Sequence, residues 1–357
     1  MERPQVVIEV RPRLKACQVY YHVKQTEDNL RDQLYSIEIQ SSAIAFQCDR
    51  RKDETFVFDT LKLKPNFING LTRTDGDNVI TCRLKILSVI NESNQSTTST
   101  KFVPNVDKDT STQISCRNCN FDLLKEDTSF TRILPLPSSD FNPGDLFCHA
   151  HCEAELQSEN SLDPRQFDLL YGNYFFRIHE HLLCDSRLLC ENYAVCCKRC
   201  KTCVGSKDRT SIKLWNCTVA FGHNDSPVTP EEDFVLLVKN CLDDSVSAMC
   251  KLIISCRSVS GDKEYLLLWI MDRSLTVLTS SEGSNKLISK NVIKLLYSHE
   301  KSHSHMVCEW EKDVNTQTLE VVEIMFTEGL GYLKRSSMLF PQLFRQANNM
   351  NISYLGI

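Results

Sequence analysis

Apolar and polar residues alternate along short segments of the first 110 residues, as they do in half-buried β-strands. The run Tyr35-Ser-Ile-Glu-Ile-Gln is an example, since side chains two residues apart share one face of a strand. Runs of this kind, separated by turn residues such as Asp75-Gly-Asp, predict strands over residues 5–10, 17–23, 35–47, 55–63 and 79–89. The polar tract 91–100 is predicted to be a linker. Residues 1–110 are therefore expected to form a β-rich N-terminal domain.

Residues 226–357 have a mixed pattern. Thr229 followed by Pro230 and two glutamates predicts a helix start, because a hydroxyl cap, an early proline and acids all suit the first turn. Strands are predicted at 251–256, 265–272 and 275–280, and a second helix at 319–328, with Gly329-Leu-Gly331 as its C-cap. The predicted fold class is mostly β with an α+β C-terminal part, in which helices pack on strands.

Residues 111–225 contain eleven of the 18 cysteines. Two Cys-x-x-Cys knuckles stand out, and each can give two thiolates to one tetrahedral Zn²⁺. Their sequences are Cys116-Arg-Asn-Cys119 and Cys197-Lys-Arg-Cys200. Each knuckle adjoins a predicted strand, at 112–115 and at 193–196, so the region is expected to be a β structure built around structural zinc.

The energetics favour one shared site. Closing the chain over residues 120–196 costs about 4 kcal/mol, whereas structural zinc returns about 10–16 kcal/mol. Buried packing thiols or a redox Cys-x-x-Cys are the alternatives, and Cys196 and Cys203 compete with Cys197 and Cys200 in the ligand register. Gly205 is expected to provide a turn after the second knuckle.

Composition narrows the class of protein. A chain of 357 residues is expected to contain two or three domains. The net charge of −5 argues against direct nucleic-acid binding, which favours a basic surface. The N-terminal residues have no apolar signal core, and the longest apolar run, 266–271, is too short to cross a bilayer. The cysteines are therefore expected to stay reduced, in the cytoplasm and nucleus, with no membrane contact.

The segment between the knuckles is a candidate recognition element. Pro135 and Pro137 flank Leu136 in an extended stretch that reaches Phe141 and then Cys148-His149. Long loops with apolar anchors often bind partners. The Cys148-His149 pair can be a second metal site, with His151 and Cys152 nearby, a reactive thiol, a group offered to a partner's metal, or an ordinary loop cysteine. His299, His303 and His305 lie in a run that is predicted to be a polar loop.

The order of these motifs resembles a known family. Cys-x-x-Cys, Arg-Ile-Leu-Pro-Leu-Pro-Ser, Cys-His, Cys-Lys-Arg-Cys-Lys, an aliphatic helix and a short terminal strand follow one another here. This is similar to the HECT-like ubiquitin-conjugating-enzyme-binding proteins, which are described as ubiquitin-protein ligases. The similarity is specific over 116–205 and looser elsewhere.

The resemblance implies a set of roles. Cys116, Cys119, Cys197 and Cys200 match the family's paired cysteines. Residues 228–242, with Phe234 and Leu237, match the part that docks a ubiquitin-conjugating enzyme carrying ubiquitin. Residues 135–163 match a partner-binding insert that engages the zinc-dependent endonuclease of pre-mRNA 3′-end cleavage, where Cys148, beside His149, approaches the nuclease metal.

One departure concerns catalysis. HECT ligases use a cysteine near the chain end that forms a thioester with ubiquitin, whereas the last cysteine here is Cys308. The resemblance, despite this departure, predicts a ubiquitin-protein ligase-like protein that binds a conjugating enzyme and promotes ubiquitin transfer. The alternative is a non-catalytic binding protein that inhibits or chaperones the endonuclease. Cys308 and Cys148 are poor thioester candidates from the sequence, which leaves the catalytic residues unknown.

Overall fold

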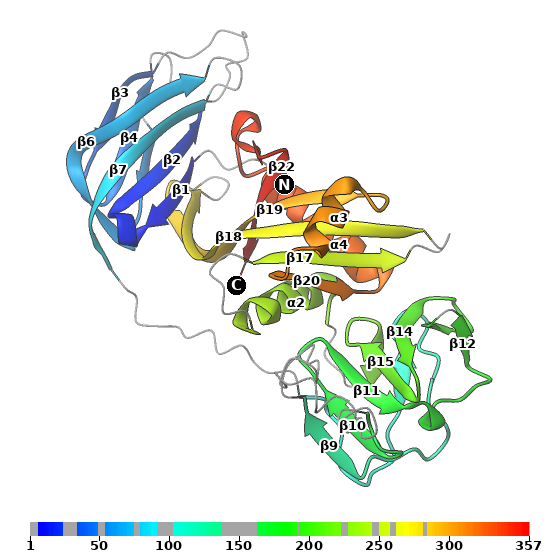
Figure 1. Ribbon diagram of the computed structural model, residues 1–357. Coiled ribbons are helices and arrows are strands. Elements are labelled where there is room, and N and C mark those ends of the chain that lie inside the picture. The colour runs from blue at the N-terminus through cyan, green and yellow to red at the C-terminus, as the bar shows by residue number, and fades with distance from the viewer. Residues whose placement is uncertain are drawn as a thin grey trace, which may run out of the picture.

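The computed structural model describes residues 6–23, 34–48, 54–74, 79–90, 103–136, 163–191, 193–222, 228–244, 250–257, 262–280 and 284–356. Within these residues β-strands dominate, with helices in the C-terminal part (Figure 1). The predicted fold class is confirmed.

A ten-stranded sheet joins the two ends of the chain. Its strands come from both the N-terminal and the C-terminal region: β1 (Val6–Arg11), β2 (Ala16–His22), β6 (Leu61–Thr74), β7 (Val79–Val89), β17 (Lys251–Arg257), β18 (Lys263–Ser280), β19 (Leu287–Glu300), β20 (Thr316–Glu320), β21 (Gln346–Ala347) and β22 (Met350–Gly356). The path runs β21-β22-β19-β18-β1-β2-β7-β6, with β17 on β18 and β20 on β17. The predicted N-terminal domain and C-terminal region therefore share one sheet, while their division into domains stays a prediction.

The long strand β18 connects the two halves. Its first half pairs with β17, and Thr276–Thr279 pair with Val10–Val7 of β1. The register with β19 shifts between Ile270 and Leu275, and such irregularities bend a strand. The predicted strands 265–272 and 275–280 are thus two arms of one strand.

A three-stranded sheet of β3 (Leu34–Ile39), β4 (Ala43–Cys48) and β5 (Glu54–Val57) packs against β1, β2, β6 and β7. Tyr21 stacks on Phe46 with ring centroids 3.8 Å apart, and Phe56 meets both rings at an edge. The predicted strands 35–47 and 55–63 were too long, because turns at 40–42 and 58–60 divide each of them.

The cysteine-rich region forms its own sheet. The order is β12 (Leu188–Glu191), β13 (Ala194–Cys197), β14 (Cys203–Asp208), β15 (Ser211–Trp215), β11 (Phe175–His179), β10 (Asp168–Tyr171) and β9 (Arg132–Pro135), and a separate pair joins β16 (Val219–Phe221) to β8 (Ile114–Cys116). An apolar core that includes Phe130, Phe176 and Leu214 lies inside it. We call residues 103–222 the cysteine module.

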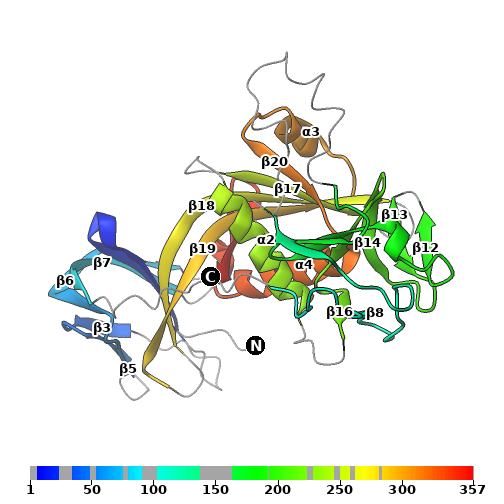
Figure 2. The same cartoon turned by 90° about the horizontal axis from the view of Figure 1, so that it is seen from below.

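Helices cover both faces of the C-terminal strands. Helices α2 (Pro230–Asp244) and α4 (Glu323–Ser337) share a core with Leu252 and Ile254 of β17. Helix α3 (His305–Glu311) packs on Ile253, which points to the opposite face. Figure 2 shows α3 on one side of β17 and β18, with α2 and α4 on the other. Short 3₁₀ turns complete the fold at η1 (Pro12–Leu14), η4 (Glu180–Leu182) and η5 (Gln342–Phe344).

The predicted start of α2 is confirmed in detail. The Thr229 Oγ1 accepts a hydrogen bond from the Glu232 N–H, and the Glu232 carboxylate accepts one from the Thr229 N–H. This reciprocal pair is a capping box, which satisfies two backbone donors at the helix start.

The predicted helix 319–328 was placed too early. Residues 316–320 form β20 parallel to β17, and α4 begins at Glu323. Gly329 lies inside α4 and does not end it, since a Cβ there would overlap with the Phe234 ring of α2. The glycine allows the two helices to approach closely.

Candidate metal centre

Four cysteine sulfurs meet between the two knuckles. The Sγ atoms of Cys116, Cys119, Cys197 and Cys200 all lie within 4.8 Å of one another. Cys116 Sγ is 3.6 Å from Cys200 Sγ, and Cys119 Sγ is 3.6 Å from Cys197 Sγ. Among the residues that the structure describes, this is the one group of three or more Cys, His, Asp or Glu side chains that could hold a metal ion.

The distances suit a tetrahedral ion and exclude disulfides. Metal–sulfur bonds of about 2.3 Å place sulfurs about 3.8 Å apart around a tetrahedron, whereas a disulfide bond is about 2.05 Å long. Cys116 and Cys197 are buried, and Cys119 and Cys200 are partly buried. The predicted ligand register is therefore the one that can hold a metal ion.

The two knuckles have the same backbone design. The N–H of Asn120 donates to the Cys116 carbonyl at 2.8 Å, and the N–H of Lys201 donates to the Cys197 carbonyl at 2.8 Å. Asn120 and Lys201, each following the second cysteine of its knuckle, have positive φ angles of 55° and 62°. These tight turns bring each pair of sulfurs to one side.

Polar groups prepare the sulfurs for negative charge. The N–H groups of Asn118 and Cys119 donate to the Cys116 sulfur, although burial dominates and raises the pKa of that thiol. Burial also acts to raise the pKa of Cys200, but hydrogen bonds from Thr202 and Asn118 outweigh it and lower this pKa to about 6. A divalent cation would favour the thiolate form at all four positions.

Cys196 and Cys203 lie next to the cluster without joining it. They are cross-strand partners on β13 and β14. Since neighbouring residues of a strand point to opposite faces, Cys196 faces away from the core that Cys197 enters. Gly205 is in β14, where a Cβ would overlap with the Lys213 carbonyl oxygen, so its predicted role as a turn residue was wrong.

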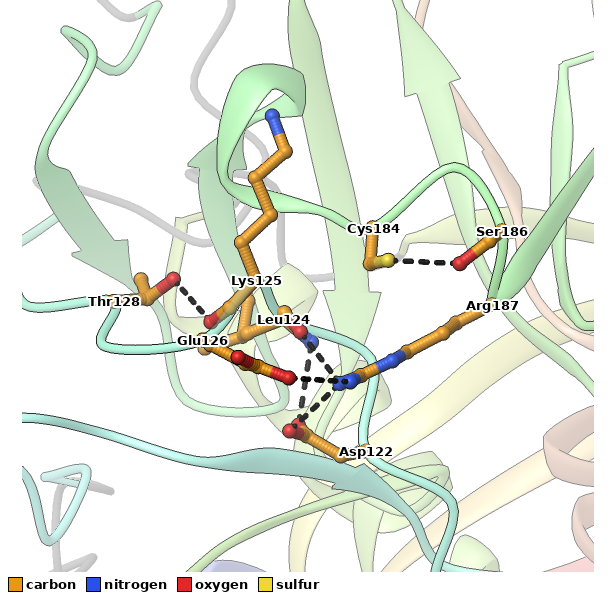
Figure 3. Close-up of polar contacts among 8 residues, drawn as sticks. All are labelled: Asp122, Leu124, Lys125, Glu126, Thr128, Cys184, Ser186 and Arg187. Atoms are coloured by element: carbon orange, nitrogen blue, oxygen red, sulfur yellow. Dashed lines mark hydrogen bonds and ion pairs between the residues drawn. The ribbon is translucent and has the colours of Figure 1, made fainter.

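Arg187 ties the two knuckle-bearing segments together. Its guanidinium donates to the Asp122 carboxylate at 2.9 Å and to the Leu124 carbonyl at 2.8 Å, and it lies 3.9 Å from Glu126 (Figure 3). Its own carbonyl accepts from the Lys198 N–H of the second knuckle. No local pattern indicates this contact, because the partners are far apart in the chain.

Another thiol, that of Cys184, lies near Arg187 and outside the four-cysteine cluster. Cys184 Sγ is 3.0 Å from Ser186 Oγ (Figure 3). This hydrogen bond lowers the pKa of the Cys184 thiol, and the nearby Arg187 adds to the effect. Cys184 is therefore a thiol that could compete with other cysteines in a reactivity measurement.

The predicted partner-binding insert is described only at its two ends. Pro135 ends β9, and Leu136 packs against the core that contains α2. Strand β9 runs parallel to β10, and Arg132 makes two hydrogen bonds to Asp168 across the pair. Pro137, Phe141, Cys148 and His149 lie outside the described residues, as do His151 and Cys152.

The two predicted contact residues on α2 face inward. Phe234 is 0% exposed and Leu237 is 1% exposed, so neither side chain has surface to offer a partner in this fold. An aspartate at either position would be buried without a partner and would destabilise the protein. A contact residue on the surface could be changed to aspartate without unfolding the protein, so these two positions do not behave as contact residues. The outward stripe of α2 is the alternative; it contains Glu232, Leu236, Lys239 and Asp243.

A buried carboxyl joins α2 to the cysteine module. Asp233 is 0% exposed, and its Oδ2 accepts from the Cys217 N–H at 2.7 Å. Burial raises the pKa of Asp233 to about 7, and the nearby Glu232 charge adds to the rise. The Cys217 hydrogen bonds and the Arg117 charge lower this pKa by a smaller amount. Asp233 is thus largely neutral below pH 7 in the folded protein.

The variant Asp233→Asn tests this assignment. A folded-state pKa above the unfolded value of 3.8 gives stability that is present at low pH and lost as pH rises to about 7. The gain in unfolding free energy from Asp233→Asn is therefore expected to be about 2–3 kcal/mol larger at pH 8 than at pH 5. Urea unfolding at both pH values measures it, and equal effects at the two values would contradict the raised pKa.

No helix among the described residues is long and apolar enough to span a membrane.

Similarity to known proteins covers nearly the whole chain. The family model described as HECT-like ubiquitin-conjugating enzyme (E2)-binding matches residues 9–352. A protein from Mus musculus that is named an E3 ubiquitin-protein ligase is 24% identical over 326 residues, which cover 83% of this chain and 83% of that protein. The protein of the same name from Homo sapiens is 24% identical over 370 residues, 90% of each chain. No solved structure matches this chain.

Proposed function

Because the chain belongs to the HECT-like ubiquitin-conjugating enzyme (E2)-binding family, we propose that it binds a ubiquitin-conjugating enzyme that carries ubiquitin and promotes transfer of the ubiquitin to substrates. The match over residues 9–352 carries this proposal. Relatives from mouse and human, which the chain covers over most of their length, are named ubiquitin-protein ligases.

We place the enzyme-docking surface on the outward stripe of α2. The opposite face of the helix is used inside the protein: Phe234 packs on α4 at Gly329, and Asp233 accepts from the cysteine module. Leu236 and Lys239 are half-buried and lie one turn apart on the remaining face. A partner that presents an apolar contact next to an acidic group would complement this face.

The variants Leu236→Asp and Lys239→Glu are expected to weaken binding of the conjugating enzyme by about tenfold or more each, which is the usual size for an interface anchor. Calorimetric titration of a panel of ubiquitin-conjugating enzymes into the full-length protein measures this effect. Both variants are expected to keep the metal content and melting temperature of the wild type.

A charge reversal on the neighbouring helix, Lys334→Glu, is the matched control, since Lys334 is exposed on α4. Full affinity in both α2 variants, or an equal loss in Lys334→Glu, would remove α2 from the docking surface and leave the family role to another part of the chain.

We propose zinc as the ion at the metal centre. Four thiolates form a complete tetrahedral shell of soft ligands, which Zn²⁺ prefers. A complete shell has no open position for water or substrate, so the ion has a structural role. It would hold the β8 and β13 knuckles together and with them the rest of the cysteine module.

Binding to the endonuclease of pre-mRNA 3′-end cleavage stays a prediction from the resemblance. It depends on Cys148, which is outside the described residues. What the described ends contribute is anchorage: the Leu136 N–H donates to the Tyr171 carbonyl at 2.8 Å, next to the Arg132–Asp168 pair. We also propose that the protein is located in the cytoplasm and nucleus.

A further inference from the structure

A thiol, an imidazole and a carboxylate form a chain at helix α3. Cys308 Sγ is 3.3 Å from His303 Nδ1, and His303 Nε2 is 2.9 Å from Glu311 Oε2. The thiol and the carboxylate contact different nitrogens of one ring. They therefore do not surround a common point, and the arrangement does not suit a metal ion. It is the order of groups found where a cysteine acts as nucleophile.

The hydrogen-bond order fixes the working tautomer. A carboxylate accepts, so the His303 Nε2–H donates to Glu311, and the Nδ1 lone pair then faces the thiol. His303 can thus take the proton of Cys308, while Glu311 orients the ring and stabilises the imidazolium that forms.

The groups stand on a rigid support and remain open to solvent. Val307 and Trp310 of α3 are buried against Ile253 and Leu267 of the sheet. Cys308 and Glu311 are three residues apart and share one helix face. Cys308 is partly exposed, and the His303 side chain is 48% exposed. A macromolecular donor can therefore reach the sulfur.

We propose that Cys308 is the thiol that accepts ubiquitin from the conjugating enzyme, with His303 as its base and Glu311 as the residue that positions His303. The inference rests on the proposed function, which supplies the ubiquitin thioester as donor. The assignment depends on the hydrogen-bond chain at α3, since Cys308 lies earlier in the sequence than the nucleophile of a HECT ligase would.

Transfer of ubiquitin to Cys308 and then to a substrate lysine needs no further reactant. His303 takes the Cys308 proton, and the thiolate attacks the ubiquitin carbonyl carbon of the enzyme-bound thioester. A new sulfur–carbon bond forms, the old one breaks, and the departing thiolate of the conjugating enzyme takes the proton from His303. A substrate lysine amine then attacks the Cys308 thioester, and the released Cys308 sulfur takes up the proton that the amine loses.

The first test uses a donor that requires no conjugating enzyme: the thioester of ubiquitin with 2-mercaptoethanesulfonate. Full-length protein is expected to form a ubiquitin thioester, seen as an adduct that a thiol reagent removes. The variant Cys308→Ser is expected to form no such thioester. His303→Gln is expected to slow its formation at least tenfold, because a positioned general base typically contributes more than that to a rate. Non-reducing gels and peptide mapping measure rate and position.

Matched controls are available on the same chain. His305→Gln alters a neighbouring histidine, which lies 3.7 Å from Glu309, and it is expected to leave the rate unchanged. Cys190→Ser, at an exposed cysteine of the cysteine module, is expected to do the same. Glu311→Gln is expected to lower the rate severalfold and Glu311→Asp to restore part of it, which a purely structural role would not produce.

A second measurement needs no ubiquitin. Iodoacetamide is expected to alkylate Cys308 at least tenfold faster than Cys190 in the same sample, and His303→Gln is expected to remove that advantage. The proposal is overturned if the adduct maps to Cys184 or persists in Cys308→Ser as a thioester, or if no adduct forms and Cys308 reacts no faster than Cys190. If the protein binds a conjugating enzyme but Cys308 forms no thioester, the proposed function stands and only the Cys308 site is refuted. If Cys308 forms the thioester but no conjugating enzyme binds, only the docking role is refuted.

Discussion

Replacing Cys197 by serine is expected to abolish metal binding and to unfold the cysteine module. Cys197 is 0% exposed and its sulfur lies in the four-thiol cluster. A structural zinc ion contributes about 10–16 kcal/mol, which is as large as the whole net stability of a domain, about 5–15 kcal/mol. The measurements are metal content by mass spectrometry and thermal unfolding of the full-length protein. A strong chelator is expected to reproduce the effect in the wild type.

The neighbouring residue provides the control. Cys196→Ser alters the next cysteine in the chain, which faces the other side of β13 and pairs with Cys203. It is expected to keep one equivalent of zinc and to change stability by about 1 kcal/mol, the usual size for one hydrogen bond, here that of the half-buried Cys196 thiol with Cys203. If Cys196→Ser loses the metal while Cys197→Ser retains it, the ligand register is wrong by one residue.

The sequence predicted those features that depend on neighbouring residues. The α2 start was predictable because Thr229 and Glu232 satisfy each other's backbone groups within one turn. The knuckles were predictable because two residues between cysteines make a tight turn by themselves. The choice between Cys196 and Cys197 was open, since it depends on which face of β13 meets the core, and no local pattern reveals that.

Features that depend on distant contacts were harder to predict. The conformational freedom of glycine predicts a helix end at Gly329, whereas in the structure this glycine leaves room for Phe234, 95 positions earlier in the chain. Phe234 and Leu237 were predicted to be docking residues because the resemblance assigns residues 228–242 to docking, and a resemblance does not show which side chains of that helix are covered by neighbours. Here both the sheet and the cysteine module pack on α2. The Cys308–His303–Glu311 chain was missed because His303 lies in a polar loop whose fold brings its ring back to α3.

A buried charge joins the two ends of the chain, and it gives the second large expected effect. Glu9 of β1 is 0% exposed; its carboxylate accepts from Lys294 Nζ of β19 at 2.5 Å and from the Tyr354 hydroxyl of β22 at 2.7 Å. Arg11 completes the set at 2.8 Å. Burial acts to raise the pKa of Glu9, but these partners outweigh it and lower the pKa below 4.5. The resulting stability is present above pH 4.5 and is lost as pH falls through the folded-state pKa.

The variant Lys294→Met is expected to lower the free energy of unfolding by about 3–5 kcal/mol at pH 7, because it leaves the Glu9 carboxylate buried without its main partner. The double variant Glu9→Gln/Lys294→Met is expected to recover most of that loss, since glutamine can still accept from Tyr354 and no buried charge remains. Urea unfolding of Glu9→Gln, Lys294→Met and the double variant measures the coupling between the two positions. The loss in Lys294→Met should also shrink as pH falls below 4.5, where Glu9 takes up a proton. Additive single and double effects would show that Glu9 and Lys294 do not act as a pair, and that the two ends of the sheet are joined by backbone pairing and apolar packing alone.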